Sequence, residues 1–253
     1  MTSHLLIPDP HSHPDYSNER FTALGRLIVD LKPDVVVCIG DMADMPSLCS
    51  YDKGTKGFEG RRYIKDIEAV HDAQEKMFAP IKRAKKKLPR FIMHEGNHEY
   101  RIKRAISGDA AQLDGVISPR DLQYENFGWE YIEYEGSTPG INIVDDVAYA
   151  HFFTSGIMNR AISGLHPANA LLTKQFMSCS QGHAHITDYS VRTRADKKHM
   201  HGLVAGWFGD YYADFAGVAN DLWWSGVIYK ENVRDGMYDP NWISMNLIKD
   251  TYL

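Results

Sequence analysis

The amino-acid sequence predicts an α/β protein with mixed sheets and flanking helices, and three observations predict it. First, the apolar run "HLLIP" is followed by a helical pattern and then by "DVVVCIGD", a continuous apolar segment typical of a strand buried on both faces. Second, the short links between these segments indicate a βαβ unit, which requires parallel strands. Third, after Trp129 the pattern changes to short alternating segments separated by turn residues, which are typical of antiparallel strands.

The helices are predicted from apolar spacing and from residues that begin or end a helix. A first helix is expected over residues 17–33, because Ser17 is a suitable N-cap and Pro33 cannot continue a helix. One face of this helix carries the apolar residues Phe21, Leu24, Leu27, Ile28 and Leu31. A second helix is expected over residues 61–87, with a disturbance at Pro80. The strand "RFIMHE" and a helix beginning at "EYRIKRAIS" should follow.

The later part of the chain is expected to add antiparallel strands, which are the segments "WEYIEYE", "INIVDD", "VAYAHFF", "SVRTRA" and "HGLVAGWF". Residues 45–60 are rich in Gly, Ser and Lys and are expected to form a long loop, a feature that is often functional in a compact domain. The sequence has no internal repeat and no low-complexity linker. We therefore expect one domain over residues 1–253.

Composition excludes some classes of function. The chain has 28 basic and 33 acidic residues and a formal charge of −5, so a nucleic-acid partner would have to be bound by a local surface. Three cysteines without a CxxC pair are typical of a reduced protein, and we expect a cytoplasmic location. The N-terminus does not resemble a signal peptide, and no run approaches the roughly 20 apolar residues of a membrane span, so no membrane partner is expected.

Polar side chains follow the predicted strands at five places. They are Asp9 and His11 in "PDPHSH", Asp41 and Asp44 in "GDMAD", Asn97 and His98 in "GNHE", His151 in "VAYAHFF", and His183 and His185 in "GHAH". In α/β sheets the loops at the carboxyl ends of strands converge, so these groups are expected to meet. So many ionisable groups cannot share a buried site without a compensating cation. A pair of divalent metals satisfies this requirement, and the absence of clustered Cys argues against a structural zinc.

The order D-x-H, G-D-x-x-D, G-N-H-E, H and G-H-x-H resembles the calcineurin-like metallophosphoesterases. A single block would be weak evidence, whereas five blocks in the family's order, from Asp9 to His185, span most of the chain. The resemblance implies a metallo-dependent phosphatase-like fold, which is a two-layer mixed β-sandwich flanked by helices (αββα). It also implies two metal ions at one edge of that sandwich. Mn is expected, with Fe, Zn, Ni or Co as alternatives.

The resemblance further implies a role for each polar residue. It assigns Asp9, His11 and His185 to the first metal, Asn97, His151 and His183 to the second, and Asp41 to both. A metal-bridging hydroxide would attack phosphorus, and His98, oriented by Asp44, would protonate the leaving oxygen. The assignment of His151 as a ligand depends most on its position between the "GNHE" and "GHAH" blocks, because a single His in an apolar strand is often a core residue.

Two departures from the family pattern bear on the substrate. Pro10 occupies the middle of the D-x-H block, where a small or apolar residue is usual, and His13 adds an imidazole that could face substrate. Met45 and Pro46 stand where Ser/Thr protein phosphatases have Arg-Gly, so a protein-phosphatase substrate is not carried over. Arg62 and Arg101 are candidates for binding phosphate oxygens. Five aromatic residues late in the chain could stack a base or sugar. They are Trp207, Tyr211, Tyr212, Trp223 and Trp224.

These features together predict a dinuclear metal-dependent phosphoesterase, with a phosphodiesterase acting on nucleotide or nucleic-acid substrates as the first hypothesis. A phosphomonoesterase is the alternative, since the conserved chemistry of such a core concerns only the phosphoryl centre. A non-catalytic scaffold of the same fold is less favoured, because a scaffold would be expected to have lost ligand blocks. The oligomeric state is not indicated by the sequence.

Overall fold

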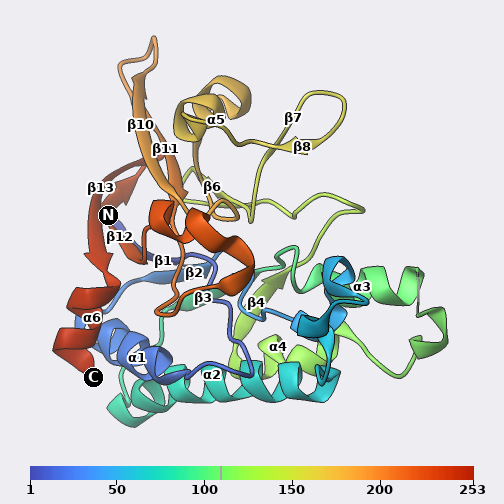
Figure 1. Ribbon diagram of the computed structural model, residues 1–253. Coiled ribbons are helices and arrows are strands. Elements are labelled where there is room, and N and C mark those ends of the chain that lie inside the picture. The colour runs from blue at the N-terminus through green and yellow to red at the C-terminus, as the bar shows by residue number, and fades with distance from the viewer. Residues whose placement is uncertain (109) are drawn as a thin grey trace.

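Two mixed β-sheets pack face to face in the computed structural model, which describes residues 1–108 and 110–253 (Figure 1). The first sheet has six strands in the order β13-β12-β1-β2-β3-β4, and the second has five in the order β10-β11-β9-β6-β5. A two-stranded hairpin, β7 (Thr154–Ser155) and β8 (Arg160–Ala161), lies beside the second sheet. The predicted α/β class with mixed sheets is confirmed.

The first sheet has a parallel centre, because its strands are linked by helices. The parallel strands are β1 (Thr2–Ile7), β2 (Val35–Cys38), β3 (Arg90–His94) and β4 (Trp129–Ile132). Helices α1 (Glu19–Leu31) and α2 (Tyr63–Ala84) form the first two crossovers. The antiparallel strands β12 (Gly226–Arg234) and β13 (Met237–Ser244) complete the sheet on the far side of β1.

The second sheet is also mixed, which corrects part of the sequence prediction. Its strands are β5 (Asn142–Val144), β6 (Val147–Tyr149), β9 (Ser178–Gln181), β10 (Thr187–Thr193) and β11 (His199–Ala205). Strands β6, β9 and β11 are parallel to one another, and only the edge strands β5 and β10 are antiparallel to their neighbours. The expectation of antiparallel strands throughout was therefore wrong. Helix α5 (Pro167–Gln175) lies between β6 and β9 and makes that connection a crossover, and β4 joins the first sheet parallel to β3.

Alternating side chains divide the core into layers. Leu5 and Ile7 pack with residues of α1, α2 and α6 (Met245–Tyr252) on the outer face of the first sheet. Leu6, between them, points to the other face and packs in one cluster with Tyr149 of the second sheet. Leu171 of α5 packs on the outer face of the second sheet. Period-two alternation thus places helices outside and the shared core between the sheets.

The helix boundaries follow the predicted signals with small differences. Helix α1 ends before Pro33, but its N-cap is Asn18 and not Ser17. Helix α2 continues through Pro80 to Ala84, so the predicted disturbance does not end it. Close packing surrounds this proline, since a Cβ on Gly25 of α1 would lie 2.2 Å from the carbonyl oxygen of Met77 and 3.1 Å from Pro80 Cγ.

The remaining segments are short. Residues 45–60 contain three 3-10 turns, which are η1 (Pro46–Leu48), η2 (Ser50–Asp52) and η3 (Lys56–Phe58). Helices α3 (Tyr100–Ser107) and α4 (Tyr124–Phe127) flank the turns η4 (Ala111–Leu113) and η5 (Pro119–Leu122), and η6 (Asp214–Leu222) precedes β12. Among the described helices, none combines the length and the apolar character needed to cross a membrane.

Candidate metal centre

The polar side chains predicted at strand ends gather at one edge of the two sheets. The turns after β1, β2 and β3 of the first sheet carry Asp9 and His11, Asp41 and Asp44, and Asn97 and His98. The segments after β6 and β9 of the second sheet carry His151, His183 and His185. Three groups from this set could each hold a metal ion, because one ligand atom from every member lies within 4.8 Å of the others. They are Asp9, His11 and His185; His11, Asp41 and His98; and Asp41, His151 and His183.

Glycine makes two of the close approaches possible. A Cβ on Gly96, the first residue of the "GNH" segment, would lie 2.1 Å from Asp41 Oδ1. A Cβ on Gly182, the first residue of "GHAH", would lie 2.2 Å from Asp9 Oδ2. Neither distance is sterically allowed, so any larger residue would push a carboxylate out of the cluster. This requirement explains why both segments begin with glycine.

Backbone strain also concentrates in the cluster. Asp9 (φ 37°), His11 (φ 44°), Asp41 (φ 54°), His183 (φ 67°) and His185 (φ 57°) all adopt positive φ. Non-glycine residues occupy this region uncommonly, and each such residue costs about 1–3 kcal/mol. Several strained residues around one group of potential ligands are typical of a functional site, where the fold maintains the strain for the sake of geometry.

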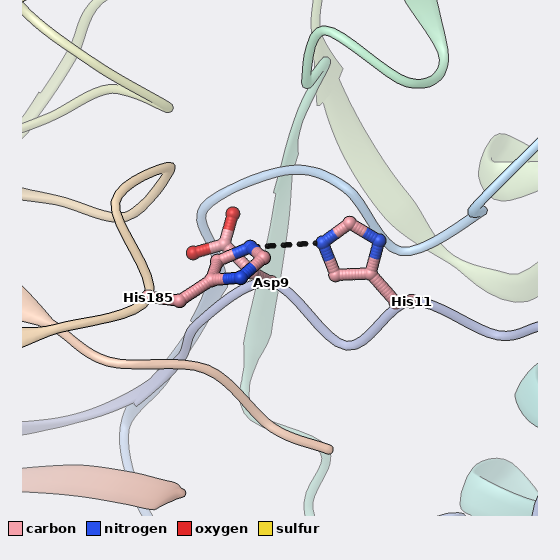
Figure 2. A group of neighbouring side chains, drawn as sticks. All are labelled: Asp9, His11 and His185. Carbon is pink, nitrogen blue, oxygen red and sulfur yellow. Dashed lines mark hydrogen bonds between the residues drawn. The ribbon is translucent and has the colours of Figure 1, made fainter. Parts of the chain in front are cut away.

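The first group joins both sheets (Figure 2). His11 Nε2 lies 3.1 Å from His185 Nε2, and the Asp9 carboxylate lies beside them. The other nitrogen of His11, Nδ1, lies 2.9 Å from Asp44 Oδ1. Burial opposes ionisation of Asp44, but hydrogen bonds from His11 and His98 hold its pKa well below the usual value, so this carboxylate accepts and His11 Nδ1 donates. The lone pair of His11 Nε2 therefore points into the cluster.

Asp41 lies between the groups. Its Oδ2 is 3.7 Å from His11 Nε2, 3.8 Å from His98 Nε2 and 3.4 Å from His151 Nε2. Its Oδ1 accepts the backbone N–H of His98 at 2.9 Å. Burial raises the pKa of Asp41, but the histidines around it lower the pKa more, and the net shift is downward. Asp41 therefore lies within reach of histidines on both sides of the cluster.

The third group, which contains His151 and His183, is rich in acceptors. His151 Nδ1 donates to the carbonyl oxygen of Ile39 at 2.9 Å, so the lone pair of Nε2 faces inward. That nitrogen meets Asn97 Oδ1 at 2.9 Å and the Asp41 carboxylate, both of which are oxygens with lone pairs. His183 Nδ1 lies 2.8 Å from the same Asn97 oxygen. Burial lowers the pKa of His151 to about 3, so near pH 7 the ring is neutral and its Nε2 lone pair can bind a metal.

A cation fits this donor set. Burial raises the pKa of Asp9 well above its usual value, and the charge of Asp41 raises it further, which shows that two carboxylates here repel each other. The inward lone pairs of His11 and His151 add to that negative potential. Imidazole and carboxylate ligands of this kind suit Zn, Fe, Mn and related divalent ions. The partners of the two Nδ1 atoms, Asp44 and the Ile39 carbonyl, orient the rings as outer partners of metal ligands commonly do.

His98 lies beside the groups and is oriented by Asp44. Its Nδ1 is 2.7 Å from the backbone oxygen of Asp44 and 2.8 Å from Oδ1 of the same residue. Its Nε2 is 3.1 Å from Arg101 Nη2, and Arg101 is itself anchored by Nη1, which donates to the backbone oxygens of Asp44 and Met45. The structure thus brings the predicted general acid, its predicted partner and one predicted phosphate-binding residue together. Their roles remain predictions.

Of the other predicted substrate contacts, one reaches the cluster. His13 Nε2 lies 3.5 Å from Asp44 Oδ2, on the opposite side of Asp44 from His11 and His98. Arg62 is exposed and donates to the carbonyl oxygen of Arg61, and we find no contact between Arg62 and the cluster among the described residues. The proximity of Arg62 in sequence therefore does not translate into a side-chain contact.

Aromatic rings flank the cluster. Trp223 meets the His185 ring edge-on at 4.3 Å, and Phe152 packs on the His183 ring at 4.8 Å. Tyr16 and Tyr211 stack with ring centroids 3.9 Å apart, and the Tyr211 hydroxyl donates to the backbone oxygen of His11. Trp207 also stacks on the His185 ring, with centroids 5.8 Å apart. The predicted residues Trp207, Tyr211 and Trp223 thus lie next to the site, and Tyr16 and Phe152 join them without having been singled out from the sequence.

Glu99 is a buried residue whose role the sequence did not reveal. Its carboxylate accepts backbone N–H groups of Asp41 (3.0 Å), Ala43 (2.8 Å) and Gly96 (2.9 Å), and the Tyr124 hydroxyl donates to it at 3.0 Å. Burial and the charge of Asp41 raise the pKa of Glu99 to about 7. Glu99 thereby ties the turn after β2 to the turn after β3. The signal was present as the last letter of "GNHE", but only the fold shows which N–H groups it binds.

Comparison with known proteins adds little to this geometry. No protein-family model matches the chain, and no curated protein matches its sequence. Among solved structures, a dimetal phosphatase from Danio rerio aligns over 96% of this chain and 96% of its own, with 10% sequence identity and a TM-score of 0.44. A likeness this distant supports no functional assignment, and the chemistry of the cluster itself has to carry one.

Proposed function

We propose that the protein is a phosphoesterase with two divalent metal ions, and that it belongs among the calcineurin-like metallophosphoesterases. One observation carries this proposal. Asp41 Oδ2 faces three imidazole nitrogens at 3.4–3.8 Å, from turns of both sheets, and the charge of Asp41 raises the pKa of the equally buried Asp9 carboxylate. The order of the five sequence blocks supports the same conclusion.

The chain's own residues have separable tasks in this proposal. Asp9, His11 and His185 would hold one ion, Asn97, His151 and His183 the other, and Asp41 would contact both. When bound, the two ions would supply Lewis acidity that neutralises the phosphate oxygens as the ester bond breaks. Glu99 keeps the turns that carry Asp41 and Asn97 in register through its backbone contacts.

His98 is the proposed general acid. Nδ1 of His98 faces two acceptors of Asp44, which fixes the ring so that Nε2, now accepting from Arg101, would be the atom that passes a proton to a leaving oxygen. Arg101 Nη2 lies next to the same nitrogen and is placed to meet a phosphate oxygen. Arg101 therefore replaces Arg62 as the phosphate-binding residue that we favour.

Within the class we propose a phosphodiesterase for nucleotides or nucleic acids, with Mn as the ion to test first. The support is the set of aromatic side chains around the cluster, which could stack a base or sugar on either side of the phosphate. A phosphomonoesterase is the second candidate, because the metal ligands and His98 would serve either ester.

Hydrolysis of two synthetic esters tests the proposal. We expect Mn-loaded protein to hydrolyse bis-p-nitrophenyl phosphate faster than p-nitrophenyl phosphate, and EDTA to abolish both activities. Faster monoester turnover would favour the phosphatase. Absence of turnover of either ester, with Mn, Fe, Zn, Ni or Co, together with failure to bind metal, would contradict the proposed function and favour a scaffold.

A further inference from the structure

A second polar cluster lies between the two sheets, away from the metal centre. His4 of β1 and Lys230 of β12 are direct neighbours across the strands of the first sheet. Tyr149 of β6 and Ser180 of β9 are direct neighbours in the second sheet. All four side chains are fully buried. Two cross-strand pairs thus face each other across the core between the sheets.

Hydrogen bonds join these pairs into a chain that crosses the core. Lys230 Nζ donates to Ser180 Oγ at 2.6 Å and to the Tyr149 hydroxyl at 3.2 Å. The Tyr149 hydroxyl in turn lies 2.8 Å from His4 Nδ1, and His4 Nε2 lies 3.0 Å from the carboxylate of Asp145, whose side chain is 39% exposed. Because Asp145 accepts, His4 Nε2 carries the ring proton, and Nδ1 accepts from Tyr149. Lys230, Tyr149 and His4 therefore donate in sequence, ending at the Asp145 carboxylate.

Aromatic faces hold the lysine amine in place. Lys230 Nζ lies 4.4 Å from the ring centroid of Tyr149 and 4.4 Å from that of Tyr238. A lysine beside a serine can also activate a nucleophile, but Lys230 and Ser180 are both fully buried and cannot meet a substrate. A polar group in an apolar core is costly unless all its hydrogen bonds are satisfied, so the cluster is expected to specify geometry more than stability.

The strands that carry this cluster also carry metal-centre histidines. Tyr149 stands two residues before His151 on the segment that leaves β6, and Ser180 stands three residues before His183 on the segment that leaves β9. On the other side, His4 belongs to β1, which leads to Asp9. The hydrogen bond between Tyr149 and His4, together with those of Lys230 beside His4, thus connects over short stretches of chain the two sheets that would bind metal.

We propose that the hydrogen-bonded cluster of His4, Lys230, Tyr149 and Ser180 is a positioning element. It holds the second sheet's histidines against the first sheet's carboxylates. The inference rests on the proposed function, because it concerns how well that metal centre is assembled. Ligand geometry must be held within about 0.5 Å for tight binding, and hydrogen bonds between facing sheets add to packing in resisting any sliding of one sheet over the other. Three hydrogen bonds between fixed cross-strand pairs prevent such sliding.

Two variants and a matched control test the proposal through metal binding. Lys230→Met removes the amine but keeps an unbranched side chain, and Tyr149→Phe removes only the shared hydroxyl. Val147→Ala, two residues before Tyr149 on the same strand and in the same core, removes packing between the sheets without touching the polar chain. Each metal-free protein is titrated with Mn²⁺ by calorimetry, and its thermal unfolding is recorded.

We expect Lys230→Met and Tyr149→Phe to bind Mn²⁺ about 10-fold more weakly, comparable to the smallest loss seen when a hydrogen-bond partner of a metal ligand is removed. Val147→Ala should unfold at a lower temperature but bind Mn²⁺ like the wild type. Unchanged Mn²⁺ binding in both Lys230→Met and Tyr149→Phe would overturn the proposal. So would a loss of binding in Val147→Ala that matches theirs, because the effect would then follow stability alone.

A further readout separates this inference from the proposed function. If the wild-type protein binds no Mn²⁺, the proposed function fails. The positioning role of the polar cluster is then tested on the metal-free protein, by ¹H–¹⁵N NMR of the histidine rings. Shifted resonances of His151 and His183 in Lys230→Met, absent in Val147→Ala, would support the positioning role. Unshifted resonances in Lys230→Met would overturn it.

Discussion

The backbone N–H of His183 donates to the carboxylate of Asp9, 2.9 Å from Oδ2, although 174 positions separate the two residues. Asp9 follows the first strand of one sheet, and His183 follows a central strand of the other. This contact brings the two sheets together at the edge where the potential metal ligands gather. A site assembled across such a contact depends on the relative placement of both sheets.

Replacing Asp9 with Asn should have opposite effects on stability and on metal binding. Burial and the charge of Asp41 raise the pKa of Asp9 in the folded state, so the ionised carboxylate destabilises the metal-free protein at neutral pH. We expect Asp9→Asn to stabilise the metal-free protein by about 1–2 kcal/mol and to weaken Mn²⁺ binding strongly. Urea unfolding and calorimetric titration measure the two effects. A variant that loses stability and keeps its metal would show that Asp9 has a structural role only.

Replacing Gly96 with Ala should disrupt the site locally. The new Cβ would lie 2.1 Å from Asp41 Oδ1 and 2.2 Å from Asp41 N, so the turn after β2 must shift. We expect a loss of about 1–3 kcal/mol in unfolding free energy, with weaker metal binding. The matched control is Gly57→Ala, whose Cβ would meet nothing closer than 3.9 Å and which should change stability by less than about 0.5 kcal/mol. Equal effects of the two substitutions would contradict the packing argument.

Glu99→Gln should loosen the turns that carry Asp41 and Asn97. Both carboxylate oxygens of Glu99 accept hydrogen bonds, and an amide group must turn its NH₂ toward at least one backbone N–H. We expect a destabilisation of about 2–3 kcal/mol and a lower metal affinity. Glu125→Gln, on an exposed neighbouring segment, is the control and should leave both quantities unchanged. If Glu99→Gln unfolds like the wild type, the backbone contacts contribute little.

His94 should make stability depend on pH. Burial lowers its pKa to about 4, against about 6.5 in the unfolded chain. Because the folded pKa is the lower one, the unfolded chain binds this proton first, and stability is full above about pH 6.5 and falls as the pH drops toward 4. The loss at the acid end is about 3 kcal/mol for this group. Urea unfolding of metal-free wild type and His94→Gln at several pH values should show a shallower decline for the variant, and parallel declines would refute the assignment.

Much of the candidate site could be predicted because strand ends are visible in a sequence. Apolar runs stop at "PDPHSH", "GDMAD" and "GNHE", and parallel strands bring such ends to the same edge of a sheet. The direction of the later strands could not be predicted, because an alternating segment such as β4 has the same pattern whichever way its neighbour runs. Helix α5 decided the direction for β6 and β9, and its hydrophobic pattern was not recognised.

The parts that escaped prediction depend on contacts between distant segments. Glu99 was visible in "GNHE", but its three backbone donors come from two different turns. Lys230 lies in a strand where a charged residue suggests a solvent face, and its burial follows only from the placement of Tyr149 and Ser180 opposite it. The prediction that Arg62 lies at the site was not supported by a contact. Closeness in sequence to a functional loop does not determine where a long side chain points.

The most direct measurement is a crystal structure of the protein soaked with Mn²⁺, with anomalous diffraction used to locate the ions. The account predicts two anomalous peaks at the edge where both sheets meet, one against His11 and His185 and one against His151 and His183, with Asp41 touching both. The absence of an anomalous peak at the cluster at saturating Mn²⁺ would contradict the proposed metal centre, provided that the side chains keep the positions described above.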